Sequence, residues 1–344
     1  EAASTPMAKI SLIMIQASQY QQQGRFSDAL PGLLSGLHLL GCHFPSDEAA
    51  AAEQLPSLFT ETHNLLNSRT DDSLLNAKDL IQPEHLLQMD LYSALTVVLY
   101  QLGRFNTYGI NSCKMLMLSL NQGFCDLTPL AYLTNAWAMS RMGETYSRCY
   151  EMARLAITLT DQRSSRYHRV LIYQGYAAFF QHWGEPLENT FSLLEKSVEW
   201  GYEGLNLTAA GHAVLLGAMN KFSKGETLEK IELETTQGLA FLCRTHQQST
   251  ENLVRFGVIQ PILALQGETE DRYSFNTKEF NITDFFGGDY STPSMELAIY
   301  SHAMIRHAYL MDDAPAQQQF IKNLPIIDAC LPHSPALTES TFYT

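Results

Sequence analysis

The sequence predicts an all-α fold, an α-solenoid in which about seven to eight antiparallel helix pairs stack into a right-handed superhelix. Three observations predict this fold. Short turns centred on glycine recur about every forty residues, and the segments between them place apolar residues at helical spacings of three and four. No segment alternates convincingly between apolar and polar residues, as a strand would.

The glycine-centred turns define the period. They lie at Gly24, Gly103, Gly143, Gly184, Gly225 and Gly267. From Gly103 onward the steps are 40, 41, 41 and 42 residues, and the first gap of 79 residues holds two steps, with a degenerate turn at 67–72. A further turn around Asp312 follows 45 residues after Gly267. Because glycine readily adopts the positive φ of a helix C-terminus, each is expected to end one helix and open the next.

The helices expected between these turns follow in order along the chain. In the N-terminal part they cover 8–22, 27–40, 47–66, 83–102 and 105–120. The later pairs are 130–142 with 145–159, 169–183 with 187–200, 207–222 with 227–243, and 252–265 with a less regular partner. Small residues such as Ala136 and Ala153 recur on the apolar faces, where they permit close helix approach.

The whole chain, 1–344, is predicted to form a single helical-repeat domain. A length of 344 residues usually splits into two or three compact domains, unless the fold grows by adding repeats. The segment 268–293 is too long and irregular for a hairpin connection, and we interpret it as an insertion, with a binding loop as the alternative. The lack of an initial Met and the helix-like ending TESTFYT predict a fragment of a larger protein.

Composition narrows the function classes. Lys and Arg total 22 against 36 Asp and Glu, and the net charge of −14 without a basic run argues against partners such as nucleic acid or an anionic membrane. Six widely spaced cysteines without a CxxC pair predict small buried hydrophobic residues in a reducing compartment. The sequence shows no signal peptide and no apolar run that could span a bilayer, so a cytoplasmic location is expected.

Motifs for chemistry are missing from the sequence. It contains no GxxxxGK[ST] loop, no GxGxxG after a strand and no GxSxG, and GGDY at 287–290 lacks the α/β surroundings that a cyclase needs. The pairs His38 with His43 and His302 with His307 are five residues apart, a spacing expected to place them on different helix faces. The sequence therefore predicts no catalytic residue, no metal site and no cofactor, and hence no enzyme.

Four stretches resemble the helical, TPR-like repeat region of bacterial STAND-type AAA ATPase signalling proteins. They are residues 120–159, which include RMGETYSRCYEMARLAITL, then 182–213, 266–280 and the opening QYQQQGRFSDALPGLLSGLHLLGCHFP. The resemblance extends over nearly the whole chain. The acidic residue expected after the turn glycine is present as Glu144 and Glu185 but replaced by Arg25 and Arg104, and 208–210 lack the aromatic residues of the family's pattern.

This resemblance implies a non-catalytic sensor and protein-interaction module that regulates a signal-transduction ATPase, kinase or transcription regulator. The alternatives are a small-molecule inducer-binding domain and a structural spacer between kinase and output modules. In all three, the partners are neighbouring domains or another signalling protein, with a small-molecule ligand in the second. Polar or bulky residues on the first helices of the pairs are candidates for contact on the concave face: Asn135, Tyr173, His212, Arg255 and Arg306.

Overall fold

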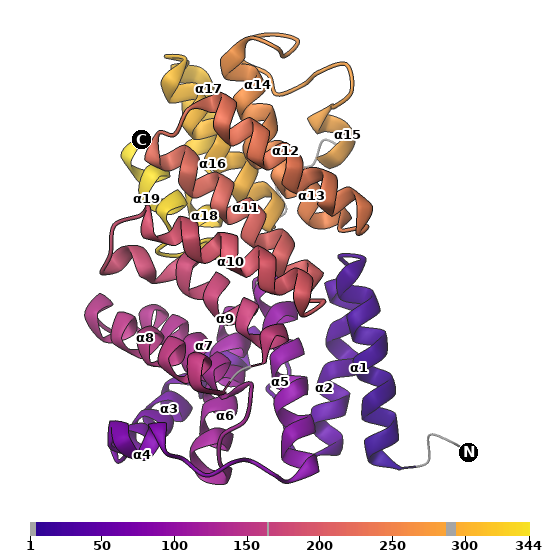
Figure 1. Ribbon diagram of the computed structural model, residues 1–344, viewed down its shortest axis with the longest axis vertical. Coiled ribbons are helices and arrows are strands. Elements are labelled where there is room, and N and C mark those ends of the chain that lie inside the picture. The colour runs from indigo at the N-terminus through magenta and orange to yellow at the C-terminus, as the bar shows by residue number, and fades with distance from the viewer. Residues whose placement is uncertain (1–4, 164, 287–293) are drawn as a thin grey trace. The chain divides into compact units, whose positions relative to one another are not determined.

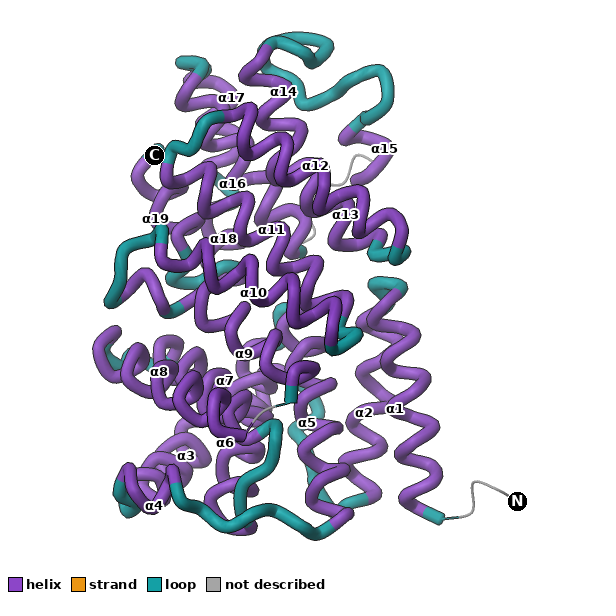
Figure 2. Tube along the Cα trace, viewed as in Figure 1, coloured by secondary structure: helices purple, strands orange, loops and turns teal. Residues whose placement is uncertain are grey.

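The computed structural model describes residues 5–163, 165–286 and 294–344, and every regular element in these residues is a helix (Figure 1, Figure 2). Outside the helices they form two isolated β-bridges, Asp79 with Phe124 and Thr277 with Phe280, and no strand. The prediction of an all-α fold is therefore confirmed. None of the helices in these three ranges is both long and apolar enough to cross a membrane.

Two compact units divide the chain, residues 1–176 and 177–344, and the boundary falls inside α9. Unit 1 contains α1 Pro6–Gln22, α2 Phe26–Leu39, α3 Glu48–Asn67, α4 Asp71–Leu75, α5 Pro83–Gln101, α6 Phe105–Gln122, α7 Thr128–Arg141, α8 Tyr146–Arg163 and most of α9 Arg166–Phe179. Helices adjacent in sequence pair as α1 with α2, α5 with α6 and α7 with α8. Other contacts skip along the chain, because α2 packs against α5 and α3 packs against α6.

Small residues on α8 allow unit 1 to pack closely. Cys149, Ala153 and Ala156 are fully buried at helical spacing, as the apolar stripe in the sequence predicts, whereas Tyr146 at the start of the helix is exposed. A side chain with a branched Cβ at these positions would hold the neighbouring α7 farther away. The contact between α7 and α8 therefore depends on side-chain size as well as on hydrophobicity.

Unit 2 contains the remaining helices. They are α10 Asn189–Glu203, α11 Leu207–Lys224, α12 Leu228–Arg244, α13 Gln248–Val254, α14 Gln260–Gln266, α15 Ile282–Phe286, α16 Met295–Leu310, α17 Ala314–Ile321, α18 Leu324–Cys330 and α19 Pro335–Phe342, with a short 3-10 helix at Gln181–Trp183 and a π-helical turn at Arg255–Ile259. α11 packs against α10 on one side and α12 on the other. α16 packs against α17, α18 and α19.

Most of the predicted glycine turns have the expected backbone. The φ angles of Gly24, Gly103, Gly143, Gly225 and Gly267 are 70°, 65°, 83°, 84° and 80°. Gly184 is different, since its φ is −124° and it follows the 3-10 helix, so the prediction of a positive φ is wrong there. His246 and Asp312 adopt the same left-handed turn without a glycine, at φ 56° and 55°. The N–H of Gln247 donates to the carbonyl of Leu242, and the N–H of Asp313 donates to the carbonyl of Ala308.

The segment predicted as an insertion, 268–293, is described as far as Phe286, and its last seven residues, with GGDY and Pro293, lie outside the described residues. The described part carries one short helix, α15, within a long loop (Figure 2). Phe275 is buried against the rings of Tyr300 and His307, and the His307 ring nitrogen Nε2 lies 2.7 Å from the carbonyl oxygen of Arg272. These contacts fasten the loop to α16.

Candidate functional site

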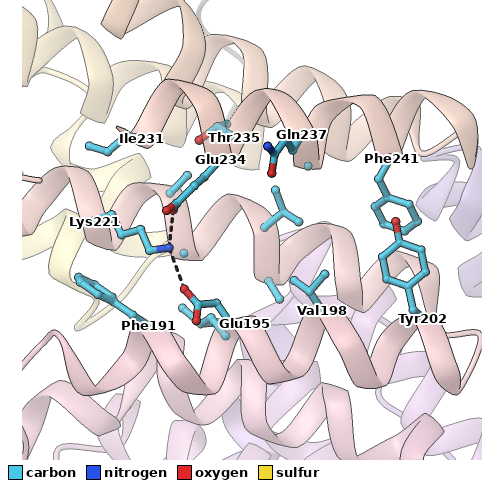
Figure 3. A pocket seen from close by; sticks show the side chains of 16 residues that line it. Phe191, Glu195, Val198, Tyr202, Lys221, Ile231, Glu234, Thr235, Gln237 and Phe241 are labelled. Carbon is cyan, nitrogen blue, oxygen red and sulfur yellow. Dashed lines mark hydrogen bonds and ion pairs between the residues drawn. The ribbon is translucent and has the colours of Figure 1, made fainter. Parts of the chain in front are cut away.

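A groove in unit 2 lies between α10 and α12, with α11 as its floor, and its volume is about 330 Å³ (Figure 3). Each wall contributes residues at helical spacing. They are Leu194 and Val198 on α10, and Ile231, Thr235 and Gly238 on α12. On the floor, Gly217 leaves space, because a Cβ placed there would meet only the Cβ of Leu194, at 3.9 Å. Small residues on α11, namely Ala213, Gly217 and Ala218, thus keep the groove open between α10 and α12.

Charged side chains meet at one end of the groove. Lys221 of α11 donates from Nζ to Glu195 of α10 at 3.0 Å and to Glu234 of α12 at 2.6 Å (Figure 3). Its ammonium group also lies 5.8 Å from the ring centroid of Phe191. Toward the other end, the rings of Tyr202 and Phe241 lie 4.2 Å apart. The groove is therefore mostly apolar along its length, with Thr235 and Gln237 as polar side chains on α12, and it is aromatic at one end and ionic at the other.

Lys221 stays protonated in this environment. Burial lowers its pKa, but hydrogen bonds and electrostatic attraction from Glu234 and Glu195 outweigh burial and leave the pKa raised. Only 11% of the Lys221 side chain is exposed, against 63% for Glu195 and 40% for Glu234. Since two carboxylates surround one ammonium group, this end of the groove carries a net charge of −1.

None of the five residues predicted as contact candidates lines the groove. In unit 1, Asn135 of α7 is fully buried, and the Tyr173 hydroxyl of α9 donates to the carboxylate of Asp161. In unit 2, His212 of α11 is partly buried, and burial lowers its pKa to about 4. Arg255, in the π-helical turn, pairs with Glu251 at 2.8 Å.

Arg306, the fifth candidate, lies in a buried cluster. Its side chain is 2% exposed, and its guanidinium carbon lies 3.6 Å from the ring centroid of Phe222. Glu339 of α19 approaches it, with 3.7 Å between Nη1 and Oε1, and also lies 3.6 Å from Nε2 of His302. Ser223 donates to Glu339 at 2.7 Å. Arg306 was predicted as a contact residue, whereas Phe222, Ser223 and Glu339, which lie with it in this cluster, were not singled out from the sequence.

One histidine prediction is wrong. His38 and His43 were expected to face apart, yet their Nδ1 atoms lie 3.1 Å from each other. α2 ends at Leu39, so His43 lies beyond the helix and the spacing rule for helix faces does not apply to it. His302 and His307 do lie on one helix, α16, and bind different partners, Ser340 and the carbonyl of Arg272.

The prediction of buried cysteines is confirmed in part. Cys113, Cys149 and Cys330 are buried, and burial raises the pKa of each thiol to about 11. Cys243, at the end of α12, is exposed, so the prediction is wrong at that position. Phe241 and Leu242 in the same last turn are buried, so Cys243 faces away from the apolar stripe.

Sequence reasoning missed the residues of the groove. Lys221, Glu195 and Glu234 are separated along the chain by 26 and 13 residues, and no local motif joins them. The signal that could have found them is the helical spacing of the lining residues on each of the three helices. On α10, for example, Phe191, Glu195 and Val198 are three and four residues apart and face one side.

Comparison with known proteins gave no match. No family model matches the chain, and neither does any curated protein or solved structure. The resemblance to the repeat region of STAND-type ATPases therefore rests on the quoted stretches of sequence and stays a prediction.

Proposed function

We propose that the chain is a non-catalytic sensor module, built as a TPR-like α-solenoid, and that unit 2 receives its signal as a ligand bound in the groove over α11. The groove itself is the observation that supports this proposal most directly. Its volume of about 330 Å³ falls in the range of small-molecule sites, which are mostly apolar with a few placed polar groups. This favours the inducer-binding form of the sensor over a structural spacer.

The chemistry of the groove favours binding over catalysis. Besides the hydroxyl of Tyr202, the titratable groups that line it in the described part of the chain are Glu195, Lys221 and Glu234. A lysine that acts as a nucleophile or base needs a lowered pKa, whereas that of Lys221 is raised. The three groups neutralise one another in part, which suits a site that orients a ligand.

In this proposal, the ligand changes the shape that the chain presents to a protein partner. A ligand shifts a conformational equilibrium only by binding one state more tightly than another. Since α10, α11 and α12 all line the groove, a ligand that contacts all three favours one spacing of these helices. The partner, by the resemblance above, is a neighbouring ATPase, kinase or output domain of a cytoplasmic signalling protein.

A thermal-shift screen of metabolites against the chain tests this proposal. A ligand that binds only the folded state stabilises it by about 2.7 kcal/mol at a concentration of 100 times its Kd. Two substitutions at one position provide matched controls. Gly217→Leu fills the groove, and Gly217→Ala adds one methyl group in ordinary contact with Leu194.

We expect compounds that raise the melting temperature of the natural chain and of Gly217→Ala but leave that of Gly217→Leu unchanged. Compounds that stabilise all three proteins equally bind elsewhere and argue against the groove. Circular dichroism checks that both variants remain helical. Co-purification of the chain with an ATPase domain, with and without a compound from the screen, then tests the regulatory part of the proposal.

A further inference from the structure

The charged end of the groove has spare hydrogen-bond acceptors. Lys221 binds one oxygen of Glu195 and one of Glu234. No hydrogen bond with another described residue uses the second oxygen of either carboxylate, and Lys230, which attracts Glu234 electrostatically, is itself paired with Glu226. The two carboxylates are 63% and 40% exposed, whereas Lys221 lies beneath them at 11%. A molecule that enters the groove therefore meets acceptors and negative charge before it meets the ammonium group.

This arrangement discriminates between ligands by charge. An anion would have to pass two carboxylates to reach Lys221, and its approach is opposed by the net charge of −1 at this end. An ammonium group is attracted by the same charge and donates to the free oxygens, and a charge-assisted hydrogen bond of this kind is stronger than a neutral one. Lys221 itself shows that an ammonium group fits between these carboxylates.

The remaining length of the groove is mostly apolar, although Thr235 and Gln237 of α12 also line it. From Lys221 to Val214 on the floor is seven residues, or about 10 Å at the rise of an α-helix. Val198 lines the α10 wall along this length, whereas Ile231 lies at the charged end near Lys221, and Tyr202 and Phe241 lie toward the far end (Figure 3). Aromatic rings at this end suit an aromatic or branched apolar group.

From this charge pattern and this length we infer that the groove selects an amphipathic cation: a molecule with a primary ammonium group at one end and an apolar, preferably aromatic, body about 10 Å long. The inference rests on the proposed function, since it names the class of ligand for the same groove. The ammonium group binds Glu195 and Glu234, and the apolar body lies over α11 toward Tyr202 and Phe241.

Three compounds with one carbon skeleton test this inference: 4-phenylbutylamine, 4-phenylbutanol and 4-phenylbutyrate. Their Kd values for the full chain are measured by isothermal titration calorimetry at pH 7.5, with ligand-observed NMR for weak binding. We expect the amine to bind about tenfold more tightly than the alcohol, as one charge-assisted hydrogen bond provides, and the carboxylate most weakly.

Charge variants sharpen the test. Glu195→Gln with Glu234→Gln leaves Lys221 as the one charged group among the described residues that line the groove, so the order of affinities should reverse and the carboxylate should bind best. Glu195 is exposed and Glu234 is partly exposed, so the double variant is expected to fold, which thermal unfolding checks. Gly217→Leu should abolish binding of all three compounds.

The outcomes separate the inference from the proposed function. If amine and alcohol bind alike and Gly217→Leu blocks both, the groove binds ligands and the preference for a cation is wrong. If the carboxylate binds the natural chain most tightly, Lys221 is the anchor and the inference is overturned. If none of the three binds, or if Gly217→Leu binds them all, the proposed binding function of the groove fails as well.

Discussion

At the scale of single residues, glycine has two roles in this chain, and the sequence revealed one of them. Regular spacing exposed the turn glycines, such as Gly103 and Gly143, because each recurs after about one helix pair. The glycines inside helices carry no such signal. Gly201 of α10 permits close contact with α11, whereas Gly217 borders open space.

Alanine substitutions distinguish these two helical glycines. Gly217→Ala should raise the free energy of unfolding by about 0.5–1 kcal/mol, because alanine is the better helix former and its methyl group fits. Gly201→Ala should lower it by about 1–3 kcal/mol, since the new Cβ would lie 2.6 Å from the Cβ of Ala210 and 3.0 Å from the carbonyl oxygen of Asn206. Urea unfolding measures both, and a change of the same sign in the two variants would contradict this explanation.

At the scale of elements, the helices could be predicted well and their partners poorly. Periodicity gave 207–222 and 227–243, close to α11 at Leu207–Lys224 and α12 at Leu228–Arg244. It could not show that α19 would bring Glu339 to Arg306 of α16, because that contact joins residues 33 positions apart through packing alone. The groove escaped prediction for the same reason, since its charged end combines side chains from three helices.

The buried pair gives a prediction about how α19 is held. Burial raises the pKa of Glu339, but attraction from Arg306 and His302 outweighs it, so the pKa is lowered and the carboxylate stays ionised. Glu339→Gln leaves Arg306 buried without a countercharge and should lower the free energy of unfolding by about 3–5 kcal/mol. Glu339→Gln combined with Arg306→Met should be more stable than the single variant. Urea unfolding of the natural chain, of each single variant and of the double variant measures the coupling, and additive losses would refute it.

At the scale of the whole molecule, composition and periodicity were enough to predict an all-α chain. They did not predict the division into residues 1–176 and 177–344, because the repeat spacing runs through it from Gly143 to Gly184 without a change. Nor did they predict which histidines would be buried. Burial lowers the pKa of a set of histidines spread over both units: His63, His168, His182, His212, His302 and His307.

These histidines predict how stability depends on pH. A lowered pKa in the folded state means that the unfolded chain binds protons first as the pH falls, so stability is lost from about pH 6.5 downward. For His302 the folded pKa is about 4, through burial and repulsion from Arg306. The free energy of unfolding measured in urea at pH 7 and pH 5 should therefore fall by about 2 kcal/mol less in His302→Gln than in the natural chain. An equal fall in both proteins would show that His302 is not neutral when folded.

The left-handed residues His246 and Asp312 have an evolutionary consequence. A residue with a Cβ is strained by about 1–2 kcal/mol at positive φ, and at both places the chain makes the turn that it makes with glycine at Gly225 and Gly267. Replacement of either residue by glycine would relieve that strain in two connections that do not line the groove. Unit 2 thus has a route by which a lineage adapting to heat, or tolerating damaging mutations elsewhere, could gain stability while its ligand preference stays the same.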